Sequence, residues 1–249
     1  MKINSIDRSL SIIDLLSRQP NGMKLFEISG ELSLNNSTVH HILHTLLPRD
    51  YVSQDPDTRK YFLGFRFLEI SRRILDNIDI RKIAAKHLYK LHDECREAVH
   101  LAVLRNGKVI YIDKIDSKVQ LSLATYIGFA TDAHAAAGGK VLLSDLTEDR
   151  IRGLYENGFL KVYGKNTIRE IDQLLEELKN VKQQGYAIDD EEYYEGIRCV
   201  AAPIRAGGKI IASVSITGSI FTVTPERIES ELIHQVMETG KRISAELRW

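Results

Sequence analysis

Side chains that could catalyse a reaction or hold a metal occur in two places in this chain of 249 residues. His92 and Cys95 stand three residues apart, a spacing that puts two ligands on one face of a helix, and His100 follows in the next strand. Cys199 with His134 offers a thiol nucleophile and a base. His100 lies beyond the expected helix end, however, and the apolar residues after Cys199 are typical of a buried thiol. We therefore expect no catalytic residue, no metal site and no cofactor.

Residues suited to binding a small molecule occur in three segments of the same half of the chain. In IIASVSITG, strand alternation puts Ser213, Ser215 and Thr217 on one face, which is either a binding surface or simply a solvated one. An acidic run begins at Asp189, a residue that would favour a hydroxyl or amine donor. Ala137-Gly138-Gly139 precedes an expected helix, whose first N–H groups would suit a carboxylate.

A further polar surface belongs to the segment 25–52, which predicts two short helices joined by a turn. Leu25, Ile28 and Leu32 form the apolar stripe of the first helix. Asn35-Asn36-Ser37 offers side-chain oxygens to the N-terminus of the second. That helix buries Val39, Ile42, Leu43 and Leu46. The positions that project outward, as in a recognition helix, are Asn36, Ser37, Thr38, His40, His41 and His44. The helices alone also fit a helical hairpin whose polar face is merely solvated.

The residues after this helix favour the DNA-binding alternative. Pro48 ends the helix, and the segment 51–64 predicts a strand, a polar turn at Asp55-Pro56-Asp57 and a second strand. A preceding helix from Asn4 or Ser5, with Ile6, Leu10, Ile13 and Leu16 on one stripe, completes a winged helix. The basic side chains placed where phosphates would pass are Arg49, Arg59 and Lys60.

The charge balance limits this DNA-binding interpretation. The whole chain has 34 basic and 34 acidic residues. Residues 1–64 contain seven Lys or Arg and seven Asp or Glu, so the predicted domain is not basic overall. Phosphate contacts supply sequence-independent affinity. We expect a modest non-specific affinity that depends strongly on salt.

A continuous helical pattern begins at Phe65 and continues to about Asp79. Phe67, Ile70, Ile74 and Ile78 recur at spacings of three and four, so one side of this helix is apolar and needs cover. The cover is either a second copy of the chain or the following domain.

The region from Ile80 onward predicts a second domain of α+β class. A helix to about Cys95 is followed by strands around Asn106-Gly107, the strongest hairpin signal in the chain. Further strands are expected at 119–125, near Ala187, at 198–204 and at 209–217. Thr167 and Glu170 predict a capping box for a helix over 168–184, with Gly185 as its C-cap. Mostly antiparallel strands with helices gathered at the ends indicate α+β.

The overall composition fits two domains without a membrane segment. The chain is 43% hydrophobic and long enough for a sizeable core. No apolar run could cross a bilayer, and the N-terminus MKINSIDRSL lacks an apolar signal segment. We expect a cytoplasmic protein without a membrane partner. Cys95 and Cys199 lack paired spacing, so we expect both to be reduced.

Five blocks of sequence resemble the IclR family of bacterial transcription regulators, in the family's order. They are LFEIS…STVHHIL…TL…YV, the YFLG end of the wing, HAAAGGK at 134–140, GYAIDDEEYYEGIRCVAAPI at 185–204, and ASVSITG at 212–218. Ser33 and Asp50 stand where family members usually carry Gly, and His41 where they commonly carry Arg. A neutral imidazole cannot make the bidentate contact of arginine with guanine.

The resemblance implies a winged helix-turn-helix domain at 1–64, a linker helix at 65–79 and a GAF-like effector-binding domain with an antiparallel sheet at 80–249. It implies binding of double-stranded operator DNA, and a homodimer, with pairing into a homotetramer in relatives. The matching effector-contact positions are Ala137, Gly138, Asp189, Cys199, Ser215 and Thr217.

The function that follows is regulation of a catabolic operon, by repression or activation, under the control of a carboxylic acid or sugar acid. An enzyme that uses the second domain's pocket, or a DNA-binding protein with a purely structural dimerisation domain, are the alternatives.

Overall fold

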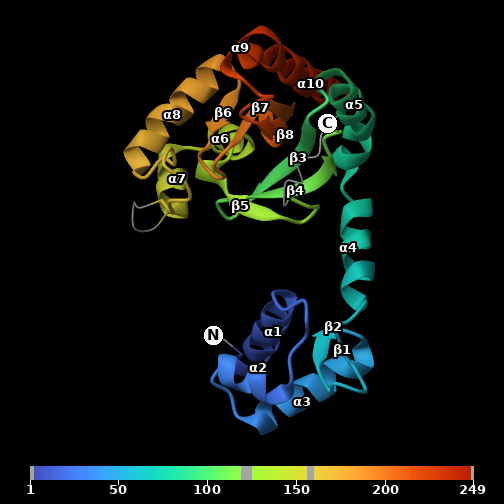
Figure 1. Ribbon diagram of the computed structural model, residues 1–249. Helices are drawn as coiled ribbons and strands as arrows, with labels where there is room; N and C mark the ends of the chain where they lie inside the picture. The colour runs from blue at the N-terminus through green and yellow to red at the C-terminus, as the bar shows by residue number, and fades with distance from the viewer. Residues whose placement is uncertain (1–2, 119–124, 156–159, 248–249) are drawn as a thin grey trace. The chain divides into compact units, whose positions relative to one another are not determined.

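The computed structural model describes residues 3–118, 125–155 and 160–247 and divides the chain into two compact units, Met1–Asn77 and Ile78–Trp249 (Figure 1). Each unit has its own hydrophobic core. The strand expected over 119–125 lies, except for Thr125, outside the described residues. No helix in the described part of the chain is long and apolar enough to cross a membrane.

The first unit is the expected winged helix followed by a further helix. Its elements are α1 Asn4–Ser17, α2 Leu25–Glu31, α3 Asn36–Leu46, the short 3₁₀ helix η1 Leu47–Arg49, the hairpin β1 Val52–Gln54 and β2 Tyr61–Leu63, and α4 Arg66–Asp76. Val39 and Leu43 of α3 are buried as predicted. The stripe predicted for α1 is partly wrong, because Ile12 and Leu16 are buried whereas Ile6 and Leu10 are about half exposed. Only the later turns of α1 reach the core.

Three residues of the first unit other than glycine adopt left-handed backbone, and one of them is Arg59 of the wing turn, with φ 57°. Ser33 has φ 52° and Asp50 has φ 56°. These are the two positions where the family usually has Gly, and a left-handed residue with a side chain costs about 1 kcal/mol. Gly64 lies against the turn at Asp50: a Cβ at Gly64 would stand 2.0 Å from the carbonyl oxygen of Asp50. Glycine is therefore required at the base of the wing.

The second unit is built on an antiparallel sheet, and its α+β class agrees with the prediction. The described strands follow the order β5-β4-β3-β8-β7-β6, with bounds β3 Ala98–Arg105, β4 Lys108–Ile115, β5 Ala130–Asp132, β6 Ala187–Asp190, β7 Ile197–Ala206 and β8 Lys209–Ser219. The β3–β4 hairpin turns at Asn106-Gly107, where both residues have positive φ, as a two-residue type I′ turn needs.

Helices cover both faces of this sheet. The helices α5 Asp79–Cys95 and α10 Ile233–Glu246 cover one face, where they bury apolar residues such as Val214 and Ile216. The opposite face, which carries Ser213 and Ser215, lies under α6 Ala137–Leu143. The remaining helical elements are η2 Ala133–Ala135, α7 Glu148–Leu154, α8 Ile171–Gln184, α9 Pro225–Arg227 and the π-helical η3 Ile228–Leu232. The predicted alternation of β8 is thus confirmed, and its polar face is covered rather than solvated.

The capping box predicted for α8 is wrong. The helix begins at Ile171 with Glu170 at its N-cap. The hydroxyl of Thr167 instead accepts hydrogen bonds from the N–H groups of Tyr163 and Gly164 and donates to the carbonyl of Glu192. The Thr167 hydroxyl, which the capping pattern would use locally, is therefore engaged in a long-range contact with Glu192. The predicted C-cap is confirmed, because Gly185 follows the helix with φ 82°.

Candidate functional site

A pocket lies between α6 and the polar face of the sheet, and we call it the α6 pocket. Its empty space of about 490 Å³ includes open solvent at its mouth. Its interior is narrow, because the centre of a water molecule can occupy only about 30 Å³ of it, room for about two waters. Its walls include every predicted effector-contact position: Ala137, Gly138, Asp189, Cys199, Ser215 and Thr217.

Strand register explains why these distant residues meet. Thr217 of β8 pairs with Cys199 of β7, and Cys199 pairs in turn with Asp189 of β6. On the other side of β8, Ser215 pairs with His100 of β3. Paired residues on neighbouring strands point to the same face. The sheet therefore lines the pocket with a row of polar side chains from consecutive strands.

Aromatic residues complete the α6 pocket, and sequence reasoning missed them. The rings of Tyr111 and Phe129 are stacked with centroids 6.0 Å apart, and the Tyr111 ring lies 4.7 Å from that of His100. Tyr193 and Tyr194 line the pocket from the segment after β6. In the sequence, only the pair Tyr193-Tyr194 beside the acidic run could have indicated an aromatic wall. Tyr111 and Phe129 look like ordinary core residues.

His100 belongs to this pocket and not to a metal site. Its Nε2 lies 3.0 Å from the Thr125 hydroxyl and its Nδ1 lies 3.4 Å from the Thr217 hydroxyl. Burial, reinforced by the nearby Lys114 ammonium, lowers the pKa of His100 to about 3. The imidazole is therefore neutral at physiological pH. His92 and Cys95 instead contact the Glu97 carbonyl.

Asp189 is the acid of the pocket and is almost completely buried. Its Oδ1 accepts a hydrogen bond from the N–H of Glu192 at 2.8 Å. Burial, together with the neighbouring Glu192 carboxylate, raises the pKa of Asp189 to about 7. Burial also raises the pKa of the Cys199 thiol well above its usual value, and the Asp189 carboxylate adds to this effect. Cys199 is thus a thiol and not a thiolate at neutral pH, unlike an activated nucleophile.

The other residues considered for catalysis lie elsewhere. His134 does not line the α6 pocket; its Nε2 lies 2.9 Å from the carbonyl oxygen of Lys161, and its ring packs beside Tyr155 and Tyr163. Within the described ranges, no group of three His, Cys, Asp or Glu residues could hold a metal ion. The Cys199 and His134 combination therefore has no shared site.

The helix α6 is fixed by features that the sequence did not reveal. Lys140 is fully buried, with its Nζ 2.5 Å from Glu192 and 3.4 Å from Glu177. Gly139 packs on Ala133, since a Cβ there would stand 2.1 Å from that carbonyl oxygen. Gly139 is therefore a packing residue, whereas Gly138 borders the pocket.

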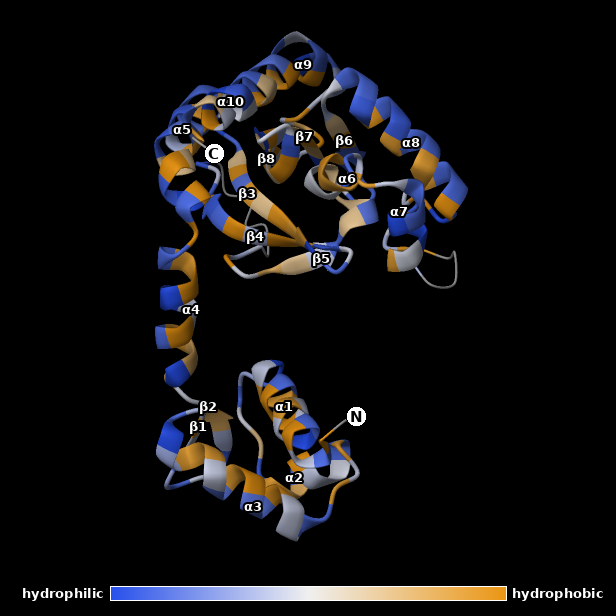
Figure 2. Ribbon diagram, turned by 180° about the vertical axis from the view of Figure 1, so that it is seen from behind, coloured by the Kyte–Doolittle hydropathy of each residue, from blue (hydrophilic) through white to orange (hydrophobic). Residues whose placement is uncertain are grey.

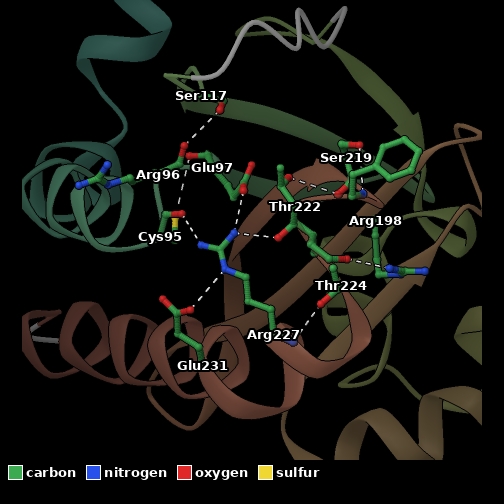
Figure 3. Close-up of polar contacts among 12 residues, drawn as sticks. Cys95, Arg96, Glu97, Ser117, Arg198, Ser219, Thr222, Thr224, Arg227 and Glu231 are labelled. Carbon is green, nitrogen blue, oxygen red and sulfur yellow. Dashed lines mark hydrogen bonds and ion pairs between the residues drawn. The ribbon is translucent and has the colours of Figure 1, made fainter.

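A second polar cluster joins segments beside the pocket strand β8 (Figure 3). The Arg227 guanidinium lies 2.8 Å from Glu97 and donates to the backbone carbonyls of Cys95 and Thr222. Glu97 also packs on Gly218, where a Cβ would meet its Oε2 at 2.5 Å. Arg227 thus holds together the end of α5, the strand β8 and the start of the C-terminal helices.

The predicted DNA-contact residues lie on the surface of the first unit. Thr38 is partly exposed, and the remaining predicted α3 positions are exposed: Asn36, Ser37, His40, His41 and His44. The rings of His40 and His44 stack with centroids 6.2 Å apart.

The basic residues of the wing differ in their surroundings. Arg49 and Arg59 are exposed, whereas the Nζ of Lys60 donates to the carbonyl of Asn21 at 3.2 Å. The turn itself is held by Asp55, whose Oδ1 accepts hydrogen bonds from the N–H groups of Asp57 and Thr58.

The α4 helix has an uncovered apolar side. Figure 2 shows apolar and polar residues alternating around it, and none of its residues is buried. Leu68 and Ile74 are each more than half exposed.

A winged helix in one unit and a polar pocket with aromatic walls in the other indicate a class of protein, a DNA-binding regulator that senses a small molecule. Comparison with known families identifies which one. The family model described as bacterial transcriptional regulator IclR C-terminal matches residues 72–245, and the IclR helix-turn-helix domain matches residues 5–56. The chain belongs to the IclR family and is a transcriptional regulator, not an enzyme. The resemblance inferred from the sequence is confirmed.

Individual relatives agree with this assignment. The chain is 32% identical to the HTH-type transcriptional regulator XynR of Escherichia coli K12, over 98% of this chain and 97% of that protein. The crystal structure of Thermotoga maritima IclR matches with a TM-score of 0.79 at 28% identity, and the match covers both chains completely. An IclR homologue from Microbacterium hydrocarbonoxydans, complexed with 4-hydroxybenzoate, shares the fold with a TM-score of 0.80 at 20% identity, over 98% of this chain and 99% of that one.

Proposed function

We propose that this regulator controls a catabolic operon and that a carboxylic acid or sugar acid bound in the α6 pocket changes its operator affinity. The observation that carries the proposal is the convergence of all six predicted effector positions on the wall of one pocket. The hydroxyls of Ser215 and Thr217 suit a hydroxylated ligand, and the rings of Tyr111 and Phe129 suit the apolar face of a sugar or an aromatic ring. The complex of the Microbacterium homologue with 4-hydroxybenzoate supports an organic acid.

We propose residues 1–64 as the DNA-binding domain, with α3 in the major groove. The partly exposed Thr38 and the exposed His41 then read base edges, while Arg49, Arg59 and Lys60 contact phosphates. Operator DNA lies in the bacterial cytoplasm, and we propose that compartment for the chain.

We further propose a symmetric dimer through the linker helix, residues 65–79, and pairing of such dimers into a tetramer through residues 80–249. One winged helix reads a half-site, so a dimer is needed for a palindromic operator. The exposed apolar side chains of Leu68 and Ile74 on α4 support a partner on that face.

The test combines operator selection with a ligand screen on the full chain. A randomised DNA library yields the operator, and thermal shift against a panel of carboxylic and sugar acids, including 4-hydroxybenzoate, yields ligands. We expect at least one acid both to stabilise the protein and to change operator affinity at fixed salt. If the chain bound DNA sequence-specifically but no acid changed its stability or its operator affinity, the second domain would be purely structural.

A further inference from the structure

The wall of the α6 pocket carries an acid and, among the described residues, no ionised base. Asp189 is that acid, and the other wall residues are small, aliphatic, aromatic or hydroxylated, apart from the neutral His100 and the Cys199 thiol. Residues 119–124, which precede the wall residue Thr125 in sequence, include no Lys or Arg. An organic acid that enters this pocket therefore meets a carboxyl group and no free positive charge.

The cations close to the pocket are already held by other groups. Lys140, whose charge acts on Asp189, is paired with Glu192 at 2.5 Å and with Glu177 at 3.4 Å. Lys114, whose charge acts on His100, has its Nζ 2.6 Å from Asp116 and 2.6 Å from the Thr125 carbonyl oxygen. Neither ammonium group lines the α6 pocket.

The surroundings of Asp189 favour its neutral form. The charged and titratable groups that act on it are Glu192, Lys140 of α6 and Cys199 of β7. Its own charge in turn acts on Tyr111 of β4. Burial and the Glu192 carboxylate outweigh Lys140 and raise the pKa of Asp189 to about 7, so the protonated form persists into the neutral range.

A protonated Asp189 would satisfy an incoming carboxylate. Its Oδ1 already accepts the N–H of Glu192, so we place the proton on the other carboxyl oxygen, although the Cys199 thiol also hydrogen-bonds to this carboxyl group. An O–H group that donates to a carboxylate forms a short, charge-assisted hydrogen bond. An ionised Asp189 would instead repel the ligand.

We propose that Asp189 determines the specificity of the α6 pocket by holding a proton, so that an organic acid anion binds together with one proton taken from solvent. This inference rests on the proposed function, because it needs an effector in this pocket. The bound anion stabilises the protonated acid, and binding therefore weakens as Asp189 loses its proton with rising pH. The regulator then responds to the acid and to pH at the same site.

The test compares ligands of nearly equal shape and different charge on the full chain. Glycolate, glycolamide and ethanolamine form one series; benzoate, benzamide and benzylamine form another. Calorimetry should show the acids binding about 30-fold more weakly at about pH 8.5 than at about pH 6, while the amides bind equally at both. Repeating the titration in buffers of different ionisation enthalpy should show uptake of up to one proton per acid bound.

The variant Asp189→Asn keeps an acceptor for the Glu192 N–H and an N–H donor for the ligand. It should bind the acids at both pH values with the affinity of the wild type at the lower one. Asp190→Asn is the matched control, because Asp190 is the exposed neighbour on the same strand and pairs with Arg198. Its pH dependence should equal that of the wild type.

Four outcomes would overturn the inference. Acid affinity that does not change with pH, or stronger binding of the amines than of the acids, would refute proton-coupled binding while leaving the pocket as an effector site. Loss of acid binding by the Asp189→Asn variant at the lower pH would show that the carboxylate itself is needed. If no compound of either series bound, the effector site itself would be wrong, and the inference with it.

Discussion

The guanidinium of Arg227 and the carboxylate of Glu97 lie 2.8 Å apart although 130 residues separate them in the sequence. Only 4% of Glu97 is exposed, and its carboxylate also packs on Gly218, the glycine that follows the pocket residue Thr217 in β8. Removing one partner of a buried ion pair leaves an uncompensated charge, which costs more than replacing both partners.

The variant Arg227→Met should therefore lower the free energy of unfolding by about 3 kcal/mol. Urea denaturation followed by circular dichroism measures this change. The double variant Glu97→Gln, Arg227→Met should recover part of the loss, because no buried charge remains. Equal loss in the single and double variants would mean that the hydrogen bonds of Arg227 to backbone carbonyls dominate instead.

Asp189 should make the stability of the second unit depend on pH. Its pKa is about 7 in the folded protein and about 4 in an unfolded chain, so the folded state binds the proton more tightly. The resulting stability is fully present below about pH 4 and is lost as pH rises to about 7, by an amount on the order of 4 kcal/mol. Urea denaturation of the wild type and of Asp189→Asn at several pH values isolates this contribution. Parallel curves for the two proteins would contradict the shift.

Mutations of base-contacting and of phosphate-contacting residues should have different effects on DNA binding. Lys60→Ala should weaken binding equally on operator and random DNA and reduce the salt dependence by about one charge. Thr38→Ala combined with His41→Ala should reduce the discrimination between operator and random DNA instead. Fluorescence anisotropy over a salt series measures both effects. Unchanged discrimination in the double variant would remove Thr38 and His41 from the base-reading surface.

The hydroxyls of β8 should be needed for the effector response but not for DNA binding. The double variant Ser215→Val, Thr217→Val removes both hydroxyl donors, and at Thr217 it leaves the side-chain volume nearly unchanged. It should weaken effector binding about tenfold or more. Ser213→Ala is the control, because Ser213 shares the same strand face but does not line the α6 pocket. Calorimetry with an acid from the screen, and operator binding without it, test the separation. Undiminished affinity in the double Val variant would place the effector elsewhere.

The apolar side of α4 should carry the dimer. Ile70→Glu with Ile74→Glu introduces charge into that face and should convert the protein to monomers in sedimentation velocity experiments. Arg72→Glu introduces the same side chain on the highly exposed polar side of the helix and should leave the dimer intact. A wild-type chain that sediments as a monomer at about micromolar concentration would refute the proposal, since a dimer that binds an operator should persist there.

Local patterns predicted the elements correctly where one interaction decides the outcome. Asn106-Gly107 favours one turn type, and strand alternation puts Ser215 and Thr217 on a single face whatever covers it. The α8 capping box failed because Thr167 contacts Glu192, which lies 25 residues further along the chain. Sequence spacing carries no information about such a contact.

The pocket could be predicted only in part for the same reason. The strand residues were found through the family's motifs, whereas Tyr111 and Phe129 reach the pocket only after the sheet has formed. Burial of Lys140 was equally hidden, because a lysine after two glycines usually lies in solvent.

The close contact of Gly64 with Asp50 packs the end of the recognition helix against the start of α4. The N–H of Gly64 donates to the carbonyl of Tyr51, and the N–H of Arg66 donates to the carbonyl of Asp50. The ring of Phe67 packs against the ring of Tyr51. These contacts tie the base of the wing to the start of α4. In a dimer held by α4, the distance between the two recognition helices is consequently fixed by how the paired linker helices cross. The separation of the operator half-sites is then a property of the linker sequence. Exchanging α4 between relatives should therefore exchange their preferred half-site separations.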